Sequence, residues 1–309
     1  MAMIEAQNVT KMLNGRTILN GVSFEVEEGD IFGFVGPNGA GKTTTIRIIL
    51  GLLKPTSGRA LVFGKELGDS DDLRRRIGVL LENDGLYERL SAYENLNYYA
   101  QLYSVSDIKE KIKNLLEFIG LSDRQNDKVG TFSKGMKRRL ALARSIIHDP
   151  YILLYDAPSA GLDPEAQKLV RDLILRLSGE KGRTIFLNSH HLDEVQRVCS
   201  RIAILQKGEI RAYDTVKSLR RKFSKPAVEI TLTDNREVKR ALDLLNSLDY
   251  VSECERDGLR ITAITKGEKT SMVLSALMKI SIQVEEVKTV TKSMEEIYLN
   301  VVRQSEGII

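Results

Sequence analysis

The sequence predicts an α/β fold around a buried parallel sheet, followed by a smaller α+β domain. First, the apolar run 31–35 leads through a glycine-rich segment into the helical sequence 45–50, which is a strand, a turn and a helix. Second, the continuous apolar runs 151–155 and 184–188 are typical of strands covered on both faces. Third, short alternating strands and amphipathic helices follow a basic, turn-forming stretch at 220–226.

Length and composition indicate a globular chain of two domains. The chain has 309 residues, more than one average domain, and its apolar fraction of 42% is ordinary for a globular protein. The net charge of +4 is too small to indicate a nucleic-acid partner, and we expect none. Cys199 and Cys254 have neither disulfide-framework nor metal-site spacing, which favours a reducing cytosol.

The sequence has no pattern typical of a membrane span or an export signal. The longest apolar run, 46–53, is interrupted by an arginine and a glycine. Residues 1–10 lack the basic-then-apolar layout of a signal peptide. We therefore expect a cytoplasmic protein that reaches a membrane only through a partner.

Local patterns place further elements between these landmarks. Residues 5–30 contain the period-two alternation of strands, with a turn at 14–15. Pro55 ends the helix after the glycine-rich segment, because proline cannot continue a helix. Residues 71–150 are mainly helical by pattern, with a capping-box sequence at 91–94.

The glycine-rich segment matches the phosphate-loop pattern G-x-x-x-x-G-K-[ST] in its required context, after a strand and before a helix. Its glycines let successive N–H groups point inward and cradle phosphate oxygens, and the helix N-terminus adds positive charge. A chance glycine-rich turn is the alternative, and the flanking elements argue against it. The predicted nucleotide-binding residues are Gly36, Pro37, Asn38, Gly39, Ala40, Gly41, Lys42, Thr43 and Thr44.

Two residues of this loop have specific roles in the prediction. Lys42 can reach the β- and γ-phosphates, and Thr43 can place its hydroxyl on a magnesium ion. Polar residues also end the two later strands, with Asp156 after the first and Asn188 in the second. Sheets of this class bind ligands at the carboxyl ends of their strands, so these residues are expected at the same site.

Four motifs follow one another in the sequence: the phosphate loop 36–44, the segment 132–137, Asp156 with the loop 159–163, and His190. In this order they resemble the motifs of the ATP-binding cassette (ABC) ATPases, and the resemblance covers residues 1–222. The resemblance implies a P-loop NTPase cassette with a RecA-like core, an antiparallel β subdomain and a helical subdomain at about 85–150. It also implies ATP and Mg²⁺ as ligands, and a homodimer or heterodimer of cassettes stacked head to tail. The partner of such a pair is an integral membrane permease, which would place this chain on the inner face of the cell membrane.

The segment 132–137 resembles the signature motif of the family, which closes over the nucleotide bound to the other cassette. The residues that would act in trans are Ser133, Lys134, Gly135 and Met136, of which Lys134 departs from the usual glycine. We interpret the following basic residues, 137–139, as a solvated helix turn.

Four further residues take their roles from the resemblance. Asp156 corresponds to the magnesium-orienting aspartate, and Asp163 belongs to the loop that signals across the dimer. His190 corresponds to the switch histidine that contacts the γ-phosphate and steadies the attacking water. Glu82 stands where many cassettes have a glutamine that links the metal site to the helical subdomain.

The sequence departs from the family pattern at the catalytic position. Ala157 occupies the place of the glutamate that polarises the attacking water. Loss of a positioned general base costs about 10²–10⁴-fold in rate, so we expect slow hydrolysis. The alanine is either natural or a substitution that traps the ATP-bound dimer, and the otherwise intact motifs favour the substitution. Glu82 could partly replace the missing base.

A second departure concerns the base of the nucleotide. The aromatic residue that often stacks on adenine corresponds here to Leu13, which offers apolar contact without π-stacking. Selectivity for adenine is therefore expected to be relaxed.

The C-terminal sequence, 226–309, predicts the element order β-α-β-β-α-β of a ferredoxin-like sandwich, with a closing helix. It resembles the accessory domain of cassettes of the drug- and antibiotic-export type. Stabilising a dimer and sensing a ligand both remain open as its role, with dimer stabilisation favoured. It contains no catalytic cluster.

Together these features predict the nucleotide-binding subunit of an ABC transporter. The resemblance of its accessory domain and its signature variant implies export. Two alternatives remain: a catalytically silent partner of a heterodimer, which Ala157 favours, and a non-transport regulator acting on ribosomes or DNA. The single set of motifs and the lack of a long coiled coil argue against the regulator. The transported substrate is expected to be selected by the permease.

Overall fold

A computed structural model describes residues 2–68, 70–189, 191–223, 226–267, 269–290 and 293–305. The chain separates into two compact units, Met1–Val216 and Lys217–Ile309. The domain boundary that we expected between residues 222 and 226 thus lies slightly later than the division between the units.

The first unit is organised around a six-stranded sheet with the order β5-β6-β7-β3-β8-β9. Neighbouring strands are parallel from β5 to β8, and only β9 runs antiparallel. Every residue of β3, β6 and β7 is buried, as the continuous apolar runs predict. The strands are β3 (Ile31–Val35), β5 (Ile77–Leu80), β6 (Ile152–Asp156), β7 (Thr184–Ser189), β8 (Arg201–Gln206) and β9 (Glu209–Thr215).

A three-stranded antiparallel sheet, β2-β1-β4, packs against this central sheet. Its strands are β1 (Ala2–Leu13), β2 (Arg16–Glu27) and β4 (Ser57–Val62). The rings of Phe24, Phe32, Phe34 and Phe186 form the contact, with Phe24 contributed by β2 and its centroid 5.3–5.9 Å from the other three. This aromatic cluster fixes the small sheet beside the strand that precedes the phosphate loop.

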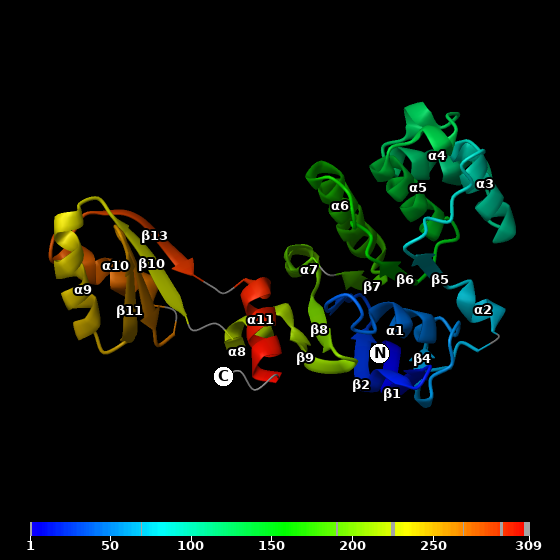
Figure 1. The fold of residues 1–309 in the computed structure, drawn as a ribbon. Coiled ribbons are helices and arrows are strands. Elements are labelled where there is room, and N and C mark those ends of the chain that lie inside the picture. Colours follow the sequence, from blue (N-terminus) through cyan, green and yellow to red (C-terminus); the bar gives the residue numbers. More distant parts are fainter. Residues whose placement is uncertain are drawn as a thin grey trace. The chain divides into compact units, whose positions relative to one another are not determined.

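The helices of the first unit include a separate group formed by α3 (Ala92–Leu102), α4 (Ile108–Phe118) and α5 (Lys134–Ile146), which contact one another (Figure 1). The capping box predicted before α3 is present, because Ser91 and Glu94 bond to each other's backbone N–H groups. The other helices are α1 (Lys42–Ile49), α2 (Asp71–Arg74), α6 (Pro164–Lys181) and α7 (Leu192–Val198), with short 3₁₀ turns η1 (Ser122–Arg124) and η2 (Val129–Thr131).

The second unit contains a four-stranded antiparallel sheet with the order β11-β12-β10-β13. Its element order, β10-α9-β11-β12-α10-β13, is the β-α-β-β-α-β order that the sequence predicts. The bounds are α8 (Val216–Phe223), β10 (Ala227–Leu232), η3 (Asn235–Glu237), α9 (Val238–Ser247), β11 (Val251–Asp257), β12 (Arg260–Thr265), α10 (Thr270–Lys279), β13 (Val284–Val290) and α11 (Met294–Ser305).

Among the described residues, no helix combines the length and the apolar character needed to cross a membrane.

Candidate nucleotide site

The loop between β3 and α1 has the backbone geometry of a phosphate cradle. Gly39 and Gly41 have φ angles of +79° and +109°, which L side chains rarely adopt. At Gly36 a Cβ atom would lie 2.2 Å from the carbonyl oxygen of Leu205, so only glycine fits between the loop and β8. These glycines allow the loop to curl tightly at the N-terminus of α1.

Lys42, the first residue of α1, points back into this loop. Its side chain is 9% exposed, and Nζ donates hydrogen bonds to the carbonyl oxygens of Gly36 at 2.8 Å and Pro37 at 3.0 Å. Burial lowers the pKa of Lys42, while the nearby Asp156 acts in the opposite direction. The ammonium group is thus held inside the cradle, with only neutral carbonyl groups as hydrogen-bond acceptors.

The ends of β6 and β7 supply polar groups to the same place. Asp156 and Asn188 lie opposite each other in the register of these strands, and the Asn188 amide donates to the Asp156 carboxylate. The Thr43 hydroxyl donates to the other carboxylate oxygen of Asp156 at 3.1 Å. The sheet therefore joins the phosphate loop to a carboxylate more than 100 residues away in the sequence.

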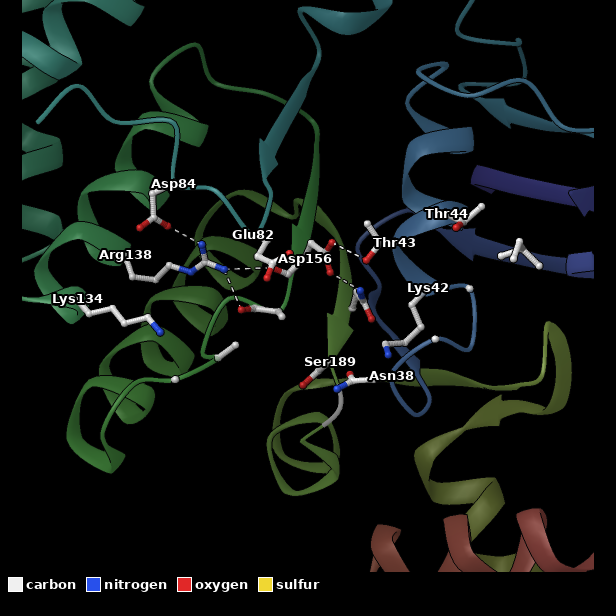
Figure 2. A pocket seen from close by; sticks show the side chains of 17 residues that line it. Asn38, Lys42, Thr43, Thr44, Glu82, Asp84, Lys134, Arg138, Asp156 and Ser189 are labelled. Carbon is white, nitrogen blue, oxygen red and sulfur yellow. Dashed lines mark hydrogen bonds and ion pairs between the residues drawn. The ribbon is translucent and has the colours of Figure 1, made fainter. Parts of the chain in front are cut away.

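A cavity of about 600 Å³ opens between these groups (Figure 2). Eleven residues that the sequence assigned to the site line it: Asn38, Gly39, Gly41, Lys42, Thr43, Thr44, Glu82, Lys134, Asp156, Ala157 and Asn188. The lining is completed by Ile18, Asp84, Arg138, Ala160, Gly161 and Ser189.

The other predicted site residues that the structure describes are not among those that line the cavity. Leu13, at the end of β1, is 40% exposed, and the apolar lining residue from this part of the chain is Ile18. Ser133 caps α5, where its hydroxyl accepts a hydrogen bond from the Met136 N–H at 3.2 Å. Asp163 caps α6 in the same way, accepting from the Ala166 N–H at 2.9 Å. Gly36, Pro37 and Ala40 belong to the loop, and Gly135 and Met136 to the first turn of α5.

His190 lies outside the described residues, so its predicted contact with the γ-phosphate stays a prediction. The neighbouring Ser189 ends β7 and lines the cavity.

Ala157 lies at the cavity wall with an unusual backbone. Its φ angle is +47°, and its N–H donates to the carbonyl oxygen of Asn188 at 2.8 Å. This left-handed conformation is uncommon for residues other than glycine. The methyl side chain offers neither a hydrogen-bond acceptor nor a base to the cavity.

Arg138 corrects the interpretation of 137–139 as a solvated helix turn, because only 6% of this residue is exposed. It follows the helical period of α5, where residues 138, 141, 142 and 145 are all buried on one face. Counting that period back from the apolar residues of α5 would have placed Arg138 inside. Lys137 and Arg139 are half-buried and pair with Glu88 and with the Ile119 carbonyl, respectively.

Like Arg138, Glu194 is a buried charged residue near the site that no sequence motif predicted. This α7 residue is 9% exposed and accepts hydrogen bonds from the hydroxyls of Ser159 and of Ser189, the latter at 3.2 Å. Ser159 belongs to the loop with Asp163, and Ser189 immediately precedes His190. The buried carboxylate of Glu194 thus connects the loop that contains Ser159 to the end of β7.

The donor set fits magnesium. Among the described residues, no three His, Cys, Asp or Glu side chains lie close enough together to hold a metal ion by themselves. Mg²⁺ typically uses only one or two carboxylates together with phosphate and water oxygens. Asp156, Glu82 and the Thr43 hydroxyl line adjoining parts of the cavity, and the buried Oδ1 of Asn188 has no hydrogen-bond partner in the described structure.

Fold and site together define a class. A glycine-rich loop between a central parallel strand and a helix, with a buried lysine and an aspartate at the carboxyl end of another strand of the same sheet, is the arrangement of phosphate-loop nucleotide-binding proteins.

Comparisons with known proteins narrow this class to one family. The ABC transporter family matches residues 19–160. The uncharacterized ABC transporter ATP-binding protein YhcH of Bacillus subtilis (strain 168) is 37% identical over 305 residues, which cover 98% of this chain and 97% of the relative. The bacitracin transport ATP-binding protein BcrA of Bacillus licheniformis is 38% identical over 262 residues, 83% of each chain. This chain belongs to the family of ABC transporter ATP-binding proteins.

A solved structure agrees with this assignment. A dimeric ATP-binding cassette in a post-hydrolysis state, bound to ADP and Pi, superposes with a TM-score of 0.62 at 27% sequence identity. The similarity covers 69% of this chain and 99% of that one.

Proposed function

We propose that this chain binds Mg-ATP in the cavity between the phosphate loop and Asp156, and that binding closes a pair of cassettes that moves a membrane permease. The observation that carries the proposal is the Lys42 ammonium, buried among loop carbonyls at 2.8 and 3.0 Å. A triphosphate would give this cation the anionic partner that the loop lacks. Asp156, Glu82 and the Thr43 hydroxyl would hold a magnesium ion, which would supply charge neutralisation at the phosphate groups.

The head-to-tail pairing is supported by the start of α5. Ser133 and Lys134 are exposed there, and the first N–H groups of a 13-residue helix need acceptors. A γ-phosphate held by a second cassette would supply such acceptors in trans. The dimeric relative with ADP and Pi supports a paired state of this kind.

An exposed apolar patch on the helical group supports a protein partner. It consists of Tyr87, Tyr98 and Leu102, which are 46%, 45% and 56% exposed. Exposed aromatic residues of this kind are typical of interface hot spots. Tyr87 of this patch follows a few residues after Glu82, which lines the nucleotide cavity. We infer that the permease contacts this patch. The fluoroquinolones export ATP-binding protein of Mycobacterium tuberculosis (strain CDC 1551 / Oshkosh), 39% identical over 213 residues, favours export.

Hydrolysis by this chain is proposed to be slow because Ala157 supplies no base. Glu82 lines the cavity and is a carboxylate that could assist, but it belongs to a different loop from Ala157. The same alanine supports a second candidate function, a catalytically silent ATP-binding partner in a heterodimer. The two candidates differ in whether turnover appears with an active second cassette.

Nucleotide binding is tested by titrating a fluorescent ATP analogue with magnesium into the parent, Lys42→Ala and Lys65→Ala proteins. We expect Lys42→Ala to bind at least about tenfold more weakly, since it loses a charge-assisted contact worth 1.4 kcal/mol or more. Exposed Lys65 is the matched control and should leave affinity unchanged. A parent protein without affinity for the analogue would overturn the proposal.

Pairing is tested by sedimentation with and without Mg-ATP. The parent should become dimeric with nucleotide, whereas Ser133→Arg should bind nucleotide and stay monomeric. If Ser133→Arg pairs as well as the parent, the signature residues do not form the interface.

Turnover is tested by phosphate release from the parent and from Ala157→Glu, measured at saturating Mg-ATP. We expect the glutamate to raise the rate by about 10²-fold or more, because a positioned base typically contributes 10²–10⁴-fold. Ala157→Gln is the matched control, since it has nearly the same shape but no base. Ordinary turnover in the parent, or equal rates in all three proteins, would contradict the proposed role of residue 157.

A further inference from the structure

The guanidinium of Arg138 uses all of its hydrogen-bond donors. An arginine side chain carries five N–H groups, and here five different oxygen atoms accept them. Figure 2 shows the side chain reaching from α5 toward Asp156 and Asp84. The acceptors are the carbonyl oxygens of Leu81 at 3.0 Å, Asp156 at 3.0 Å, Ala157 at 2.8 Å and Pro158 at 2.7 Å, and Oδ1 of Asp84 at 2.6 Å.

These acceptors belong to two segments that α5 holds together. One is 81–84, which contains Glu82 and leads to the exposed patch at Tyr87. The other is 156–158, which contains the carboxylate bonded to Thr43. Both segments start directly after the β5–β6 ladder, which pairs Leu80 with Tyr155. Beyond that ladder, the Arg138 guanidinium hydrogen-bonds to both segments and so links them.

The contact also fixes the backbone at the catalytic position. The consecutive carbonyl groups of Asp156, Ala157 and Pro158 all accept hydrogen bonds from the Arg138 guanidinium. The middle one belongs to Ala157, whose φ angle is +47°. A left-handed residue other than glycine persists only where the surroundings hold it. Arg138 supplies three of those restraints.

Lysine could not replace this arginine. An ammonium group has three donors around one atom, whereas the guanidinium spreads five over a rigid plane. Asp84 supplies the balancing charge, with 7% of the arginine side chain and 26% of the aspartate side chain exposed. A buried cation without such a partner would be strongly disfavoured.

We propose that Arg138 is a positioning residue that transmits the state of the nucleotide site to the segment 81–84 and the patch beyond it. A nucleotide or magnesium ion that moves Asp156 also moves the carbonyl groups that Arg138 holds. The planar guanidinium then carries this displacement to Leu81 and Asp84. The inference rests on the proposed binding of Mg-ATP at the cavity.

The chain lacks tryptophan, which allows a direct test. In a Tyr87→Trp protein the single indole lies three residues after Asp84, and its emission reports the environment of that segment. Fluorescence is recorded while Mg-ATP is added, and nucleotide affinity is measured separately in the same protein. The measurement is repeated after adding Arg138→Gln, Arg138→Lys or Asp84→Asn to the reporter protein.

Arg139→Gln is the matched control, because Arg139 is the next residue of α5 and bonds only to the carbonyl groups of Ile119 and Gly120. We expect Mg-ATP to change the emission of the reporter protein and of Arg139→Gln. In Arg138→Gln, compared with the reporter protein at saturating Mg-ATP, most of this change should be lost. Arg138→Lys and Asp84→Asn should lose part of the change.

The outcomes separate this inference from the proposed function. If the reporter protein binds Mg-ATP without an emission change, or Arg138→Gln responds like the reporter protein, the positioning role is overturned. If the reporter protein binds no nucleotide, the proposed function fails instead. If Arg138→Gln does not fold, Arg138→Lys and Asp84→Asn provide the test. A full emission change on adding Mg-ATP to both of these variants would overturn the positioning role of Arg138.

Discussion

The imidazole of His148 is enclosed in the first unit without full hydrogen bonding. It stacks on Tyr103, with ring centroids 3.9 Å apart and planes 12° from parallel, and its Nε2 lies 3.1 Å from the Ile77 carbonyl oxygen. Its buried Nδ1 has no hydrogen-bond partner in the described structure. Burial is the main cause that lowers the pKa of His148 to about 4, and the positive charges of Arg144 and Arg183 act in the same direction.

This pKa predicts a loss of stability in acid. Above pH 6.5 the imidazole is neutral in the folded and the unfolded chain, so it contributes no pH dependence. Between pH 6.5 and about 4 the unfolded chain takes up a proton that the folded chain does not, and the free energy of unfolding falls. The full loss is about 3 kcal/mol.

We expect His148→Gln to flatten this dependence while keeping a donor for the Ile77 carbonyl. The measurement is urea unfolding of the parent and the variant at pH 7.5, 6 and 5, pH values that span the upper part of the window. An equal slope in both proteins would show that another group titrates there.

At the scale of single elements, the phosphate loop depends on two glycines that differ in their surroundings. A Cβ atom at Gly39 would meet no other atom within 4 Å, so only its φ of +79° opposes a side chain. At Gly41 the Cβ atom would lie 2.5 Å from Leu19 Cδ2 and 3.0 Å from the Ile18 carbonyl oxygen, in addition to a φ of +109°. Both positions need glycine, but Gly41 needs it for two reasons.

We therefore expect Gly39→Ala to lower the free energy of unfolding by about 1 kcal/mol, the cost of the left-handed backbone alone. Gly41→Ala should lower it by about 2–4 kcal/mol, because overpacking adds about 1–3 kcal/mol. Urea unfolding of both variants measures the difference. Equal losses would mean that the contact with Leu19 relaxes without cost.

Helix α5 illustrates how far local patterns determine an element. The signature segment is expected at the start of a helix that runs through Leu140, and the helix spans Lys134–Ile146. The Ser133 cap fixes this start, because its hydroxyl accepts a hydrogen bond from the Met136 N–H.

At the scale of the whole chain, each unit has its own hydrophobic core. The core of the second unit includes Val228, Ile230 and Leu277, which are fully or almost fully buried between its sheet and helices. Every residue that lines the nucleotide cavity belongs to the first unit. Damage to the second core is therefore expected to leave nucleotide binding intact.

Leu277→Ala tests this separation. It should destabilise the second unit by about 2–5 kcal/mol, the range for a buried leucine cut back to alanine. Limited proteolysis should then release the second unit faster, while the affinity for the fluorescent ATP analogue stays within about threefold of the parent. A tenfold or larger loss of affinity would show that the second unit supports the site.

The local sequence by itself determined the phosphate loop, the capping box at 91–94 and the buried strands. These features follow from the spacing of residues that are close in the sequence, because backbone geometry and helix or strand period act over that range. The family resemblance followed from four such motifs in order. The contact between Asp156 and Thr43 was also expected, because parallel sheets bind ligands at the carboxyl ends of their strands and so bring the residues there together.

Only the tertiary structure decided what the buried charged side chains connect. The helical period of α5 places Arg138 on the buried face, but its acceptors come from the distant segments 81–84 and 156–158. Glu194 likewise accepts from Ser159, which is 35 residues away in the sequence. The same limit applies to Leu13, whose place near the site is taken by Ile18. A charged group is buried only where the fold supplies all its partners, and those partners come from loops whose meeting no local pattern encodes.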